Sequence, residues 1–454
     1  MLTTFDYILI AAYFLITLVV GVMAGRKQEK EDYLIANRQL NAFQTASTIF
    51  ASRIGAAILL TYTALVYLHG LGALWYFIGS VFGLFVFYYF GKKIKKLGDQ
   101  HKFYTLPDFF FFTKGRFAGY LSTLIVVIIM FGWVVLNFIA GGKLVAEYTP
   151  ISYELSVVLV AGVILAYMIA GGFRAVVITD IVQSIGIFLL IILMIFLLIS
   201  TPVKPKIILT DLFALPVKEL ISFFLAGFFI PMASPELWQR VYAVKDEKHF
   251  RRSLFLSSVF YIIIGLILMG IGLIIRVDLP DIEAGTSLII GFSKLLPVGL
   301  AGLSVVIVYS AVSSSADTYM FTTASSVTKD FLQKSGLVSE KNLFITMRIC
   351  LVILMIMGVT TAFVLKDIID TTFFFVSLTM ALGFLVLVIW IYPNLNRYSV
   401  NYTIVFCLLG VVIPTIVIGI STTLIIYAWG LCIVGLLVGI VVNYFMKSSK
   451  EKEK

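Results

Sequence analysis

Charged residues are scarce in this sequence, and their scarcity excludes an ordinary soluble protein. Asp, Glu, Lys and Arg make up only 13% of the 454 residues, whereas hydrophobic residues make up 61%. A soluble domain is about a quarter charged and about half apolar. The composition therefore predicts an all-α polytopic membrane protein.

Cysteine and histidine are scarce, with three residues of each, and the usual catalytic motifs are absent from the sequence. Cys350, Cys407 and Cys432 lie in apolar runs without metal-ligand spacing, so we expect neither a disulfide framework nor a metal site there. The three histidines are too scattered for a proton relay. We find no nucleophile–base pair, metal motif or nucleotide loop, which argues against an enzyme. A repeated pore loop is missing too, which argues against a channel.

Long apolar runs fill almost the whole chain, and no linker is long enough to separate a second module. About thirteen runs are long enough to cross a bilayer of roughly 30 Å. We therefore expect a single transmembrane domain over 1–454. The predicted spans are 5–25, 41–68, 71–91, 116–142, 153–171, 176–200, 220–241, 250–276, 298–328, 342–366, 370–392, 401–421 and 424–446.

The basic residues predict an orientation. With the N-terminus outside, the inner connections carry 25 of the 34 Lys and Arg residues and the outer connections carry 7. The remaining two, Arg53 and Arg348, are assigned to spans. The positive-inside rule then predicts an inner (plasma) membrane protein with its N-terminus outside and its C-terminus cytoplasmic. The net charge of +10 indicates anionic lipid rather than nucleic acid as the partner.

The stretch TIFASRIGAAI (48–58) places Arg53 in the middle of an apolar run, where a charge is costly and expected to have a role. Ser52 precedes it, and Gly55 allows the helix to unwind and another backbone to approach closely. Unwound carbonyl groups could bind a hard cation. This stretch is our first candidate for a binding site.

Two other stretches bring polar groups to mid-span. In SAVSSSADT (310–318), one helix face carries hydroxyl groups, with Asp317 one turn beyond Ser314, which suits Na⁺. In GGFRAVVITDIVQ (171–183), Asp180 lies about two turns into a span and needs a cation, a proton or Arg53 as a partner.

Weaker signals come from two further places. Asn137 could bind a solute or only another helix. The segment IPMASPELWQR (230–240), which contains Ser234, has two prolines inside an apolar run. That pattern is typical of a broken transporter helix, although a simple kink is the alternative.

Four stretches resemble the sodium:solute symporter family, which includes sodium-coupled sugar, proline, pantothenate and sialic acid transporters. They are EDYLIANRQL (31–40), GGFRAVVITDIVQ (171–183), PELWQRVYAVKDEKHFRR (235–252) and SSSADTYMFTTASSVTKDF (313–331).

The resemblance implies a LeuT-type core of two inverted five-helix repeats over 41–392. An extra helix over 1–25 would precede the core, and two helices over 401–446 would follow it. The first and sixth core helices, 41–68 and 220–241, would be broken at mid-membrane, with the solute between them.

The resemblance also implies a sodium site. Its ligands would be the carbonyl groups of Ala51, Ile54 and Ala311 and the hydroxyl groups of Ser314 and Ser315. Asp180 matches an acid near the sodium route, and in some members a second site uses the positions of Asp180, Asp317 and Thr318. Relatives tend to carry a hydroxyl group at the position of Asp317. At the position of Arg53 they carry asparagine, aspartate or threonine.

Arg53 therefore has three interpretations. It could bind the carboxylate of a solute through its planar guanidinium. It could form a structural pair with Asp180 or Asp317. It could also occupy the cation site and replace Na⁺, which would give a proton-coupled or uncoupled transporter.

We expect a sodium-coupled symporter for a small anionic or zwitterionic solute, acting as a monomer by alternating access. The candidate solute-binding residues are Arg53, Ser52, Asn137 and Ser234. A transporter-like sensor is a minor alternative, which growth on a sole solute in a transport-deficient host would distinguish.

Overall fold

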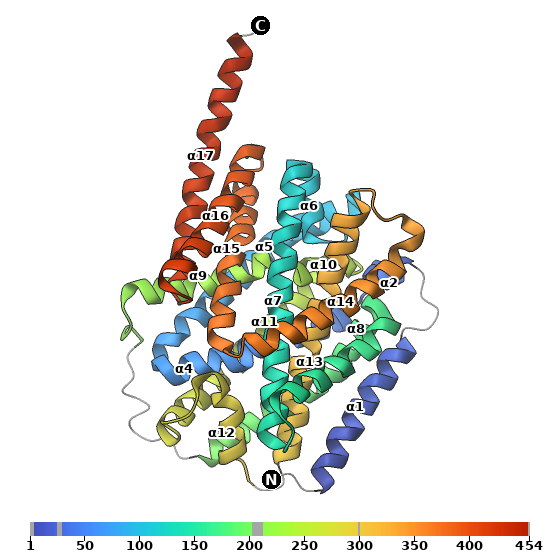
Figure 1. Cartoon of the computed structure of the whole chain (residues 1–454), viewed down its shortest axis with the longest axis vertical. Helices are drawn as coiled ribbons and strands as arrows, with labels where there is room; N and C mark the ends of the chain where they lie inside the picture. The colour runs from blue at the N-terminus through green and yellow to red at the C-terminus, as the bar shows by residue number, and fades with distance from the viewer. Residues whose placement is uncertain (1–3, 25–29, 202–211, 298–299, 453–454) are drawn as a thin grey trace.

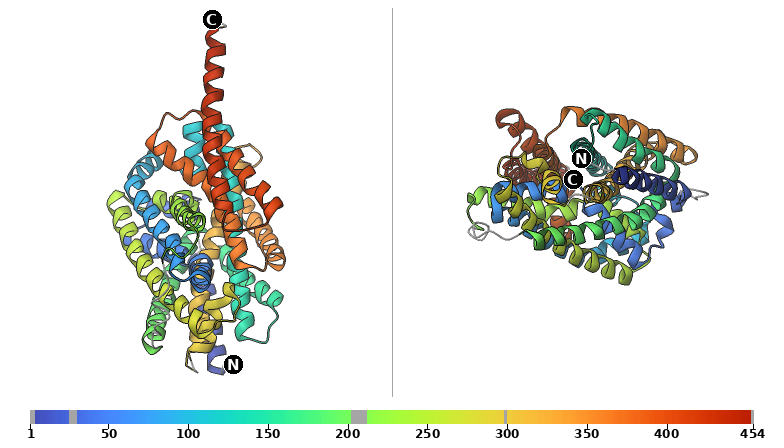
Figure 2. Two further views of the ribbon diagram at one scale, coloured as in Figure 1. Left: turned by 90° about the vertical axis from the view of Figure 1, so that its left-hand side faces the viewer. Right: turned by 90° about the horizontal axis from the view of Figure 1, so that it is seen from below.

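The computed structural model describes residues 4–24, 30–201, 212–297 and 300–452, and these ranges form helices without any β-strand. The two ends of the chain lie at opposite ends of the bundle, and α17 projects beyond the other helices (Figures 1 and 2). The long helices are α1 (Thr4–Ala24), α5 (Leu74–His101), α7 (Arg116–Tyr148), α8 (Tyr153–Ser200), α11 (Glu247–Asp278), α13 (Ala301–Ser325), α14 (Leu343–Val364), α15 (Ile368–Ile391), α16 (Arg397–Ile418) and α17 (Leu424–Lys452).

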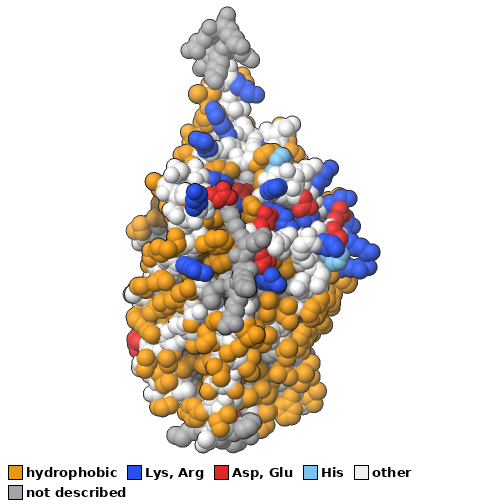
Figure 3. All heavy atoms as spheres, turned by 90° about the vertical axis from the view of Figure 1, so that its right-hand side faces the viewer, with side chains coloured by type: hydrophobic (Ala, Val, Ile, Leu, Met, Phe, Trp, Pro, Cys, Tyr) orange, Lys and Arg blue, Asp and Glu red, His pale blue; other side chains and the backbone are white. Residues whose placement is uncertain are grey.

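Within the described ranges, ten helical segments are long and apolar enough to cross a membrane. This confirms a multi-pass, all-helical membrane protein, whereas the count of thirteen spans stays a prediction. On the face drawn in Figure 3, the surface is largely apolar, and charged side chains gather toward the end from which α17 projects. The unpredicted short helices are α2 (Lys30–Ile35), α6 (Leu106–Lys114) and α12 (Ser287–Leu295), which are too short for a pattern of apolar runs to reveal.

The first predicted break is confirmed. Helix α3 (Ala42–Arg53) ends at Arg53, and a π-helical turn, η2 (Ala57–Tyr62), leads into α4 (Thr63–His69). At the end of α3, Ile54 leaves the helical region, with φ of −99° and ψ of 61°. The backbone between the two helical parts therefore has polar groups without regular intrahelical partners.

The second predicted break is confirmed as well. Helix α9 (Val217–Ala233) stops before Ser234, whose φ of −82° and ψ of 95° are extended, and α10 (Pro235–Ala243) begins at Pro235. Proline at the first position of a helix loses no hydrogen bond, because the N–H group there has no intrahelical partner. The segment is thus a broken helix and not a simple kink.

The chain also bends at the Gly171–Gly172 pair. Helix α8 contains both predicted spans 153–171 and 176–200, and its direction changes at Gly172, which has φ of +57°. A Cβ atom on Gly172 would approach the Tyr33 ring to 2.3 Å, so only glycine fits.

Helix α13 lies at the centre and packs against α7, α8 and α3, while α3 also packs against α8 and α11. Close approach at the first break depends on Gly55. A Cβ atom there would lie 2.2 Å from the Ser315 hydroxyl oxygen and 3.0 Å from the Asn137 amide oxygen. Because Gly55 has no side chain, Ser315 of α13 and Asn137 of α7 can lie close to the backbone of the broken segment.

Candidate functional site

Side chains of α13 and α7 hold the first break. Ser314 donates a hydrogen bond to the Ala51 carbonyl oxygen at 2.8 Å, and Ser315 donates to the Ser52 carbonyl oxygen at 3.0 Å. Asn137 accepts a hydrogen bond from the Ala56 N–H group at 3.2 Å. These contacts supply partners to backbone groups that the break leaves exposed.

The same contacts gather several oxygens that the family resemblance assigns to sodium. The Ser314 hydroxyl oxygen lies 2.8 Å from the Ala51 carbonyl oxygen and 3.4 Å from the Ala311 carbonyl oxygen. Ser315 is the next residue on α13 and is fully buried. Ile54 is the residue at which α3 ends, and its side chain is fully buried. Hydroxyl and carbonyl oxygens are the ligand type that a hard cation prefers.

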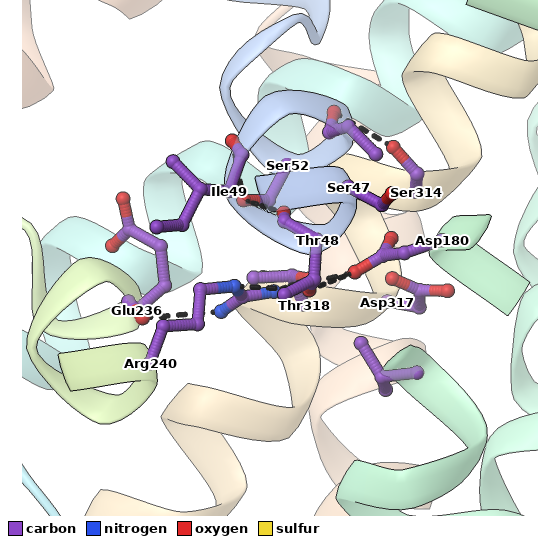
Figure 4. Close-up of polar contacts among 12 residues, drawn as sticks. Ser47, Thr48, Ile49, Ser52, Asp180, Glu236, Arg240, Ser314, Asp317 and Thr318 are labelled. Atoms are coloured by element: carbon purple, nitrogen blue, oxygen red, sulfur yellow. Dashed lines mark hydrogen bonds and ion pairs between the residues drawn. The ribbon is translucent and has the colours of Figure 1, made fainter. Parts of the chain in front are cut away.

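A buried ion pair connects the two broken helices with α8 and α13. Arg240, which is 1% exposed, contacts the Asp180 carboxylate at 3.4 Å, the Thr48 hydroxyl oxygen at 3.0 Å and the Thr318 hydroxyl oxygen at 2.8 Å. Thr48 donates a second hydrogen bond to Asp180. Figure 4 shows this chain of contacts running from α10 through α3 to α8. One guanidinium thus joins four helices across the core.

Asp317 is not part of the Arg240–Asp180 ion pair and has other partners. Its carboxylate accepts a hydrogen bond from the Tyr167 hydroxyl group at 2.7 Å, and the Thr179 hydroxyl group lies at 3.5 Å. Asp317 is fully buried, and its second oxygen has no hydrogen-bond partner. Asp180 likewise has one buried oxygen without a partner.

Arg53 behaves differently from Arg240. Its side chain lines a cavity of about 40 Å³ between the two helix breaks, and its Nε and Nη1 atoms are buried without hydrogen-bond partners. The guanidinium lies over the Tyr261 ring, 5.6 Å from the ring centre. Tyr261 is held in turn by Ser80, whose hydroxyl oxygen is 2.9 Å from that of Tyr261.

Of the three interpretations of Arg53, the structural pair with Asp180 or Asp317 is the one that these contacts contradict. Within the described parts of the chain, Arg53 forms no ion pair, because Arg240 binds Asp180 and Tyr167 binds Asp317. Arg53 also makes no hydrogen bond to the oxygens of Ala51, Ala311, Ser314 or Ser315, which speaks against its replacing Na⁺.

Sequence reasoning missed the role of Arg240, although the predicted span 220–241 contains it. Arg240 lies in α10 and is almost fully buried. One signal could have revealed it. Arg240 follows Glu236 by four positions, so both lie on one face of the helix that follows the second break.

The other solute-binding candidates lie in different places. Ser234 lines the Arg53 cavity and donates to the Ile230 carbonyl oxygen at 2.7 Å. Ser52 donates to the Thr48 carbonyl oxygen within its own helix. Asn137 donates to the Trp133 carbonyl oxygen at 2.8 Å, so both ends of its amide are engaged by backbone. The described residues contain no cluster of three or more His, Cys, Asp and Glu side chains that could hold a metal ion.

Comparison with known proteins gives the same answer for the fold. A substrate-bound, outward-open Na⁺-coupled sialic acid symporter superimposes with a TM-score of 0.83 over 97% of this chain and 98% of its own, at 15% identity. A closed nucleobase-cation-symport-1 family transporter with bromovinylhydantoin bound gives a TM-score of 0.62 over 93% of this chain and 96% of its own, at 12% identity. These likenesses confirm the LeuT-type fold.

Sequence comparison identifies the family. The sodium/pantothenate symporter of Haemophilus influenzae is 26% identical over 362 residues, which cover 72% of each chain. The sodium/proline symporter of Staphylococcus aureus strain Newman is 28% identical over 358 residues, covering 72% of this chain and 68% of its own. The model of the sodium:solute symporter family matches residues 33–398. The chain therefore belongs to the sodium:solute symporter family.

Proposed function

We propose that this protein couples the entry of Na⁺ to the uptake of a small solute that carries a carboxylate group, by alternating access around the two helix breaks. As a member of a symporter family it is a transporter and not an enzyme. The observation that carries the choice of solute is the Arg53 guanidinium, which lines the cavity and has two buried donor nitrogens without a partner.

A carboxylate is the group that fits this guanidinium best. Arg53 presents a planar fork of donors, and a carboxylate accepts two such donors in parallel. A buried donor without a partner costs free energy, so a solute that satisfies it gains affinity. Tyr261 and Ser80 hold the guanidinium in place before the solute arrives, which lowers the entropy lost on binding.

Two features support Na⁺ as the coupling ion. The assigned oxygens of Ala51, Ala311 and Ser314 lie together where α13 meets the first break. The core around the breaks also has a formal excess of one negative charge, because Arg53 and Arg240 face three acids, Asp180, Glu236 and Asp317. One monovalent cation would balance that charge. The same region, through Asp180 and Asp317, is our candidate for a second cation.

We also propose an inner-membrane protein whose N-terminus faces outward, with α17 ending on the cytoplasmic side. The gathering of charged side chains at the end from which α17 projects supports this orientation, because basic residues favour the cytoplasmic side (Figure 3). A monomer is the proposed unit.

Uptake into proteoliposomes tests the proposed coupling. A thermal-shift screen of carboxylic acids, amino acids and sugars first identifies a solute that stabilises the purified protein. Uptake of that solute is then measured with an inward Na⁺ gradient and with choline in place of Na⁺, at a fixed proton gradient. We expect accumulation only with Na⁺. Unchanged uptake in choline would overturn sodium coupling, and stabilisation by sugars alone would overturn the role of the carboxylate.

A further inference from the structure

The Arg53 cavity contains an acid, Glu236, that has entered the argument only as a charge and has no binding partner assigned to it. Glu236 lies in the first turn of α10 and lines the same cavity as Arg53 and Ser234. Its side chain is only 4% exposed, and its Oε2 atom has no hydrogen-bond partner. Figure 4 shows that the Glu236 carboxylate points away from the Arg240 guanidinium, which instead contacts the Glu236 backbone carbonyl oxygen at 3.1 Å.

Arg53 and Glu236 do not neutralise each other directly. Neither forms an ion pair within the described ranges of the chain, although their opposite charges line one small cavity. The Arg53 guanidinium lies over the Tyr261 ring instead. The cavity therefore presents a positive and a negative group that are separated from each other.

The helix breaks explain how each charge is tolerated without a partner. Arg53 is the last residue of α3, and Glu236 belongs to the first turn of α10. The C-terminal end of a helix favours a cation and the N-terminal end favours an anion, because the peptide dipoles add along the axis. Each break thus supplies a stabilised charge to the space between the helices.

From this arrangement we infer that the solute is an amino acid or a similar zwitterion with N–H groups, whose carboxylate meets Arg53 and whose ammonium group meets Glu236. The inference rests on the proposed function and adds a second subsite to it. Glu236 requires a hydrogen-bond donor, because its free oxygen is an acceptor without a partner. A primary or secondary ammonium group provides such a donor, and a quaternary one does not.

Other solute classes fit the cavity less well. A carboxylic acid without an amino group leaves Glu236 buried and unpaired, and brings a second negative charge close to it. An amine without a carboxylate leaves Arg53 unpaired, and a neutral sugar leaves both charges unpaired. The cavity volume of about 40 Å³ is room for only a few water molecules, so the solute is small or the cavity widens to admit it.

Matched solute pairs test the inference. Binding of the twenty common amino acids to the detergent-purified full-length protein is compared by thermal shift with binding of their deaminated carboxylic acids and decarboxylated amines. We expect at least one amino acid to bind roughly 10- to 100-fold more tightly than its deaminated counterpart, since the ammonium group adds a charge-assisted hydrogen bond. In Glu236→Gln this ratio should fall at least tenfold.

A control variant and the alternative outcomes separate the two proposals. Glu219→Gln removes a charge from α9 outside the cavity lining and should leave the ratio as in the wild type. Equal binding of amino acids and their deaminated acids, with no change in Glu236→Gln, overturns the zwitterion subsite and leaves the proposed function standing. If no compound with a carboxylate binds, the proposed function itself fails.

Discussion

Two arginines lie inside the helix bundle of this protein, and their surroundings are opposite. Arg240 is 1% exposed and contacts Asp180, Thr48, Thr318 and the Glu236 backbone. Arg53 has two buried nitrogens without partners and borders a cavity. A buried charge with every partner in place stabilises one arrangement of helices, whereas a charge with free donors is prepared for a ligand.

The charged residues near the two helix breaks have two different roles, one structural and one in binding. Arg240 joins α10 to α3, α8 and α13, so it connects both broken helices to the rest of the core. Arg53 and Glu236 instead border the space between the breaks. Structural and binding charges thus lie within a few residues of each other in sequence, yet they have separate partners.

The largest effect is expected for Arg240→Leu. The substitution leaves Asp180 buried without its counter-charge, which should destabilise the fold by about 3–5 kcal/mol. Thermal unfolding of the detergent-purified variant measures this loss. In the double variant Arg240→Leu with Asp180→Leu, neither charge remains unpaired, so much of the stability should return. A single variant as stable as the wild type would contradict the structural role of Arg240.

Arg53→Met should have the next largest effect, and it should affect binding rather than stability. Removal of the guanidinium takes away two hydrogen bonds to a charged group, so solute affinity should fall about 100-fold. The unfolding temperature should stay the same or rise, because a cation without a partner is replaced by an apolar side chain. Calorimetric binding and thermal unfolding on the same sample distinguish this result from misfolding.

Removal of one hydroxyl group from α13 should weaken the binding of Na⁺ more than the binding of the solute. In Ser314→Ala or Ser315→Ala, the Na⁺ concentration for half-maximal uptake should rise on the order of tenfold, because affinity for a hard cation depends on the number of oxygen ligands. Ser313→Ala is the matched control, since Ser313 accepts a hydrogen bond from Gln183 at 3.0 Å instead. An unchanged Na⁺ requirement in both variants would show that these ligands are wrongly assigned.

The smallest effect is expected for Tyr261→Phe. This variant keeps the ring beneath Arg53 but removes the hydrogen bond with Ser80. Solute affinity should fall no more than a few-fold. Tyr261→Leu removes the ring as well, and a cation–π contact of about 0.5–2 kcal/mol predicts a larger loss. If Tyr261→Phe and Tyr261→Leu bind the solute with equal affinity, the ring does not position Arg53.

Much of the fold could be predicted from the sequence, because the bilayer permits few structures. Apolar run length predicts helices, and prolines at 231 and 235 together with glycine at 55 indicate where two of them break. The short helices α2, α6 and α12 could not be predicted, because they are neither long nor uniformly apolar. The exact number of spans stays a prediction.

The partners of the buried charges were less predictable. Sequence analysis placed Arg53, Asp180 and Asp317 in the core and left three interpretations of Arg53 open, one of which was a pair with an acid. The pairing depends on the direction of each side chain across four helices, which spacing along one helix does not reveal. Arg240 lies inside the predicted span 220–241, but its pairing with Asp180 on α8 could not be deduced from spacing along one helix.

The most direct test of the account is Na⁺-driven uptake by the wild type and Arg53→Met in parallel proteoliposomes, with the solute found by thermal shift. We expect the wild type to accumulate the solute only with a Na⁺ gradient. Arg53→Met should be folded and still stabilised by Na⁺, but it should not transport the solute. Uptake by Arg53→Met at the wild-type rate and affinity would contradict the claim that the free arginine is the solute-binding one.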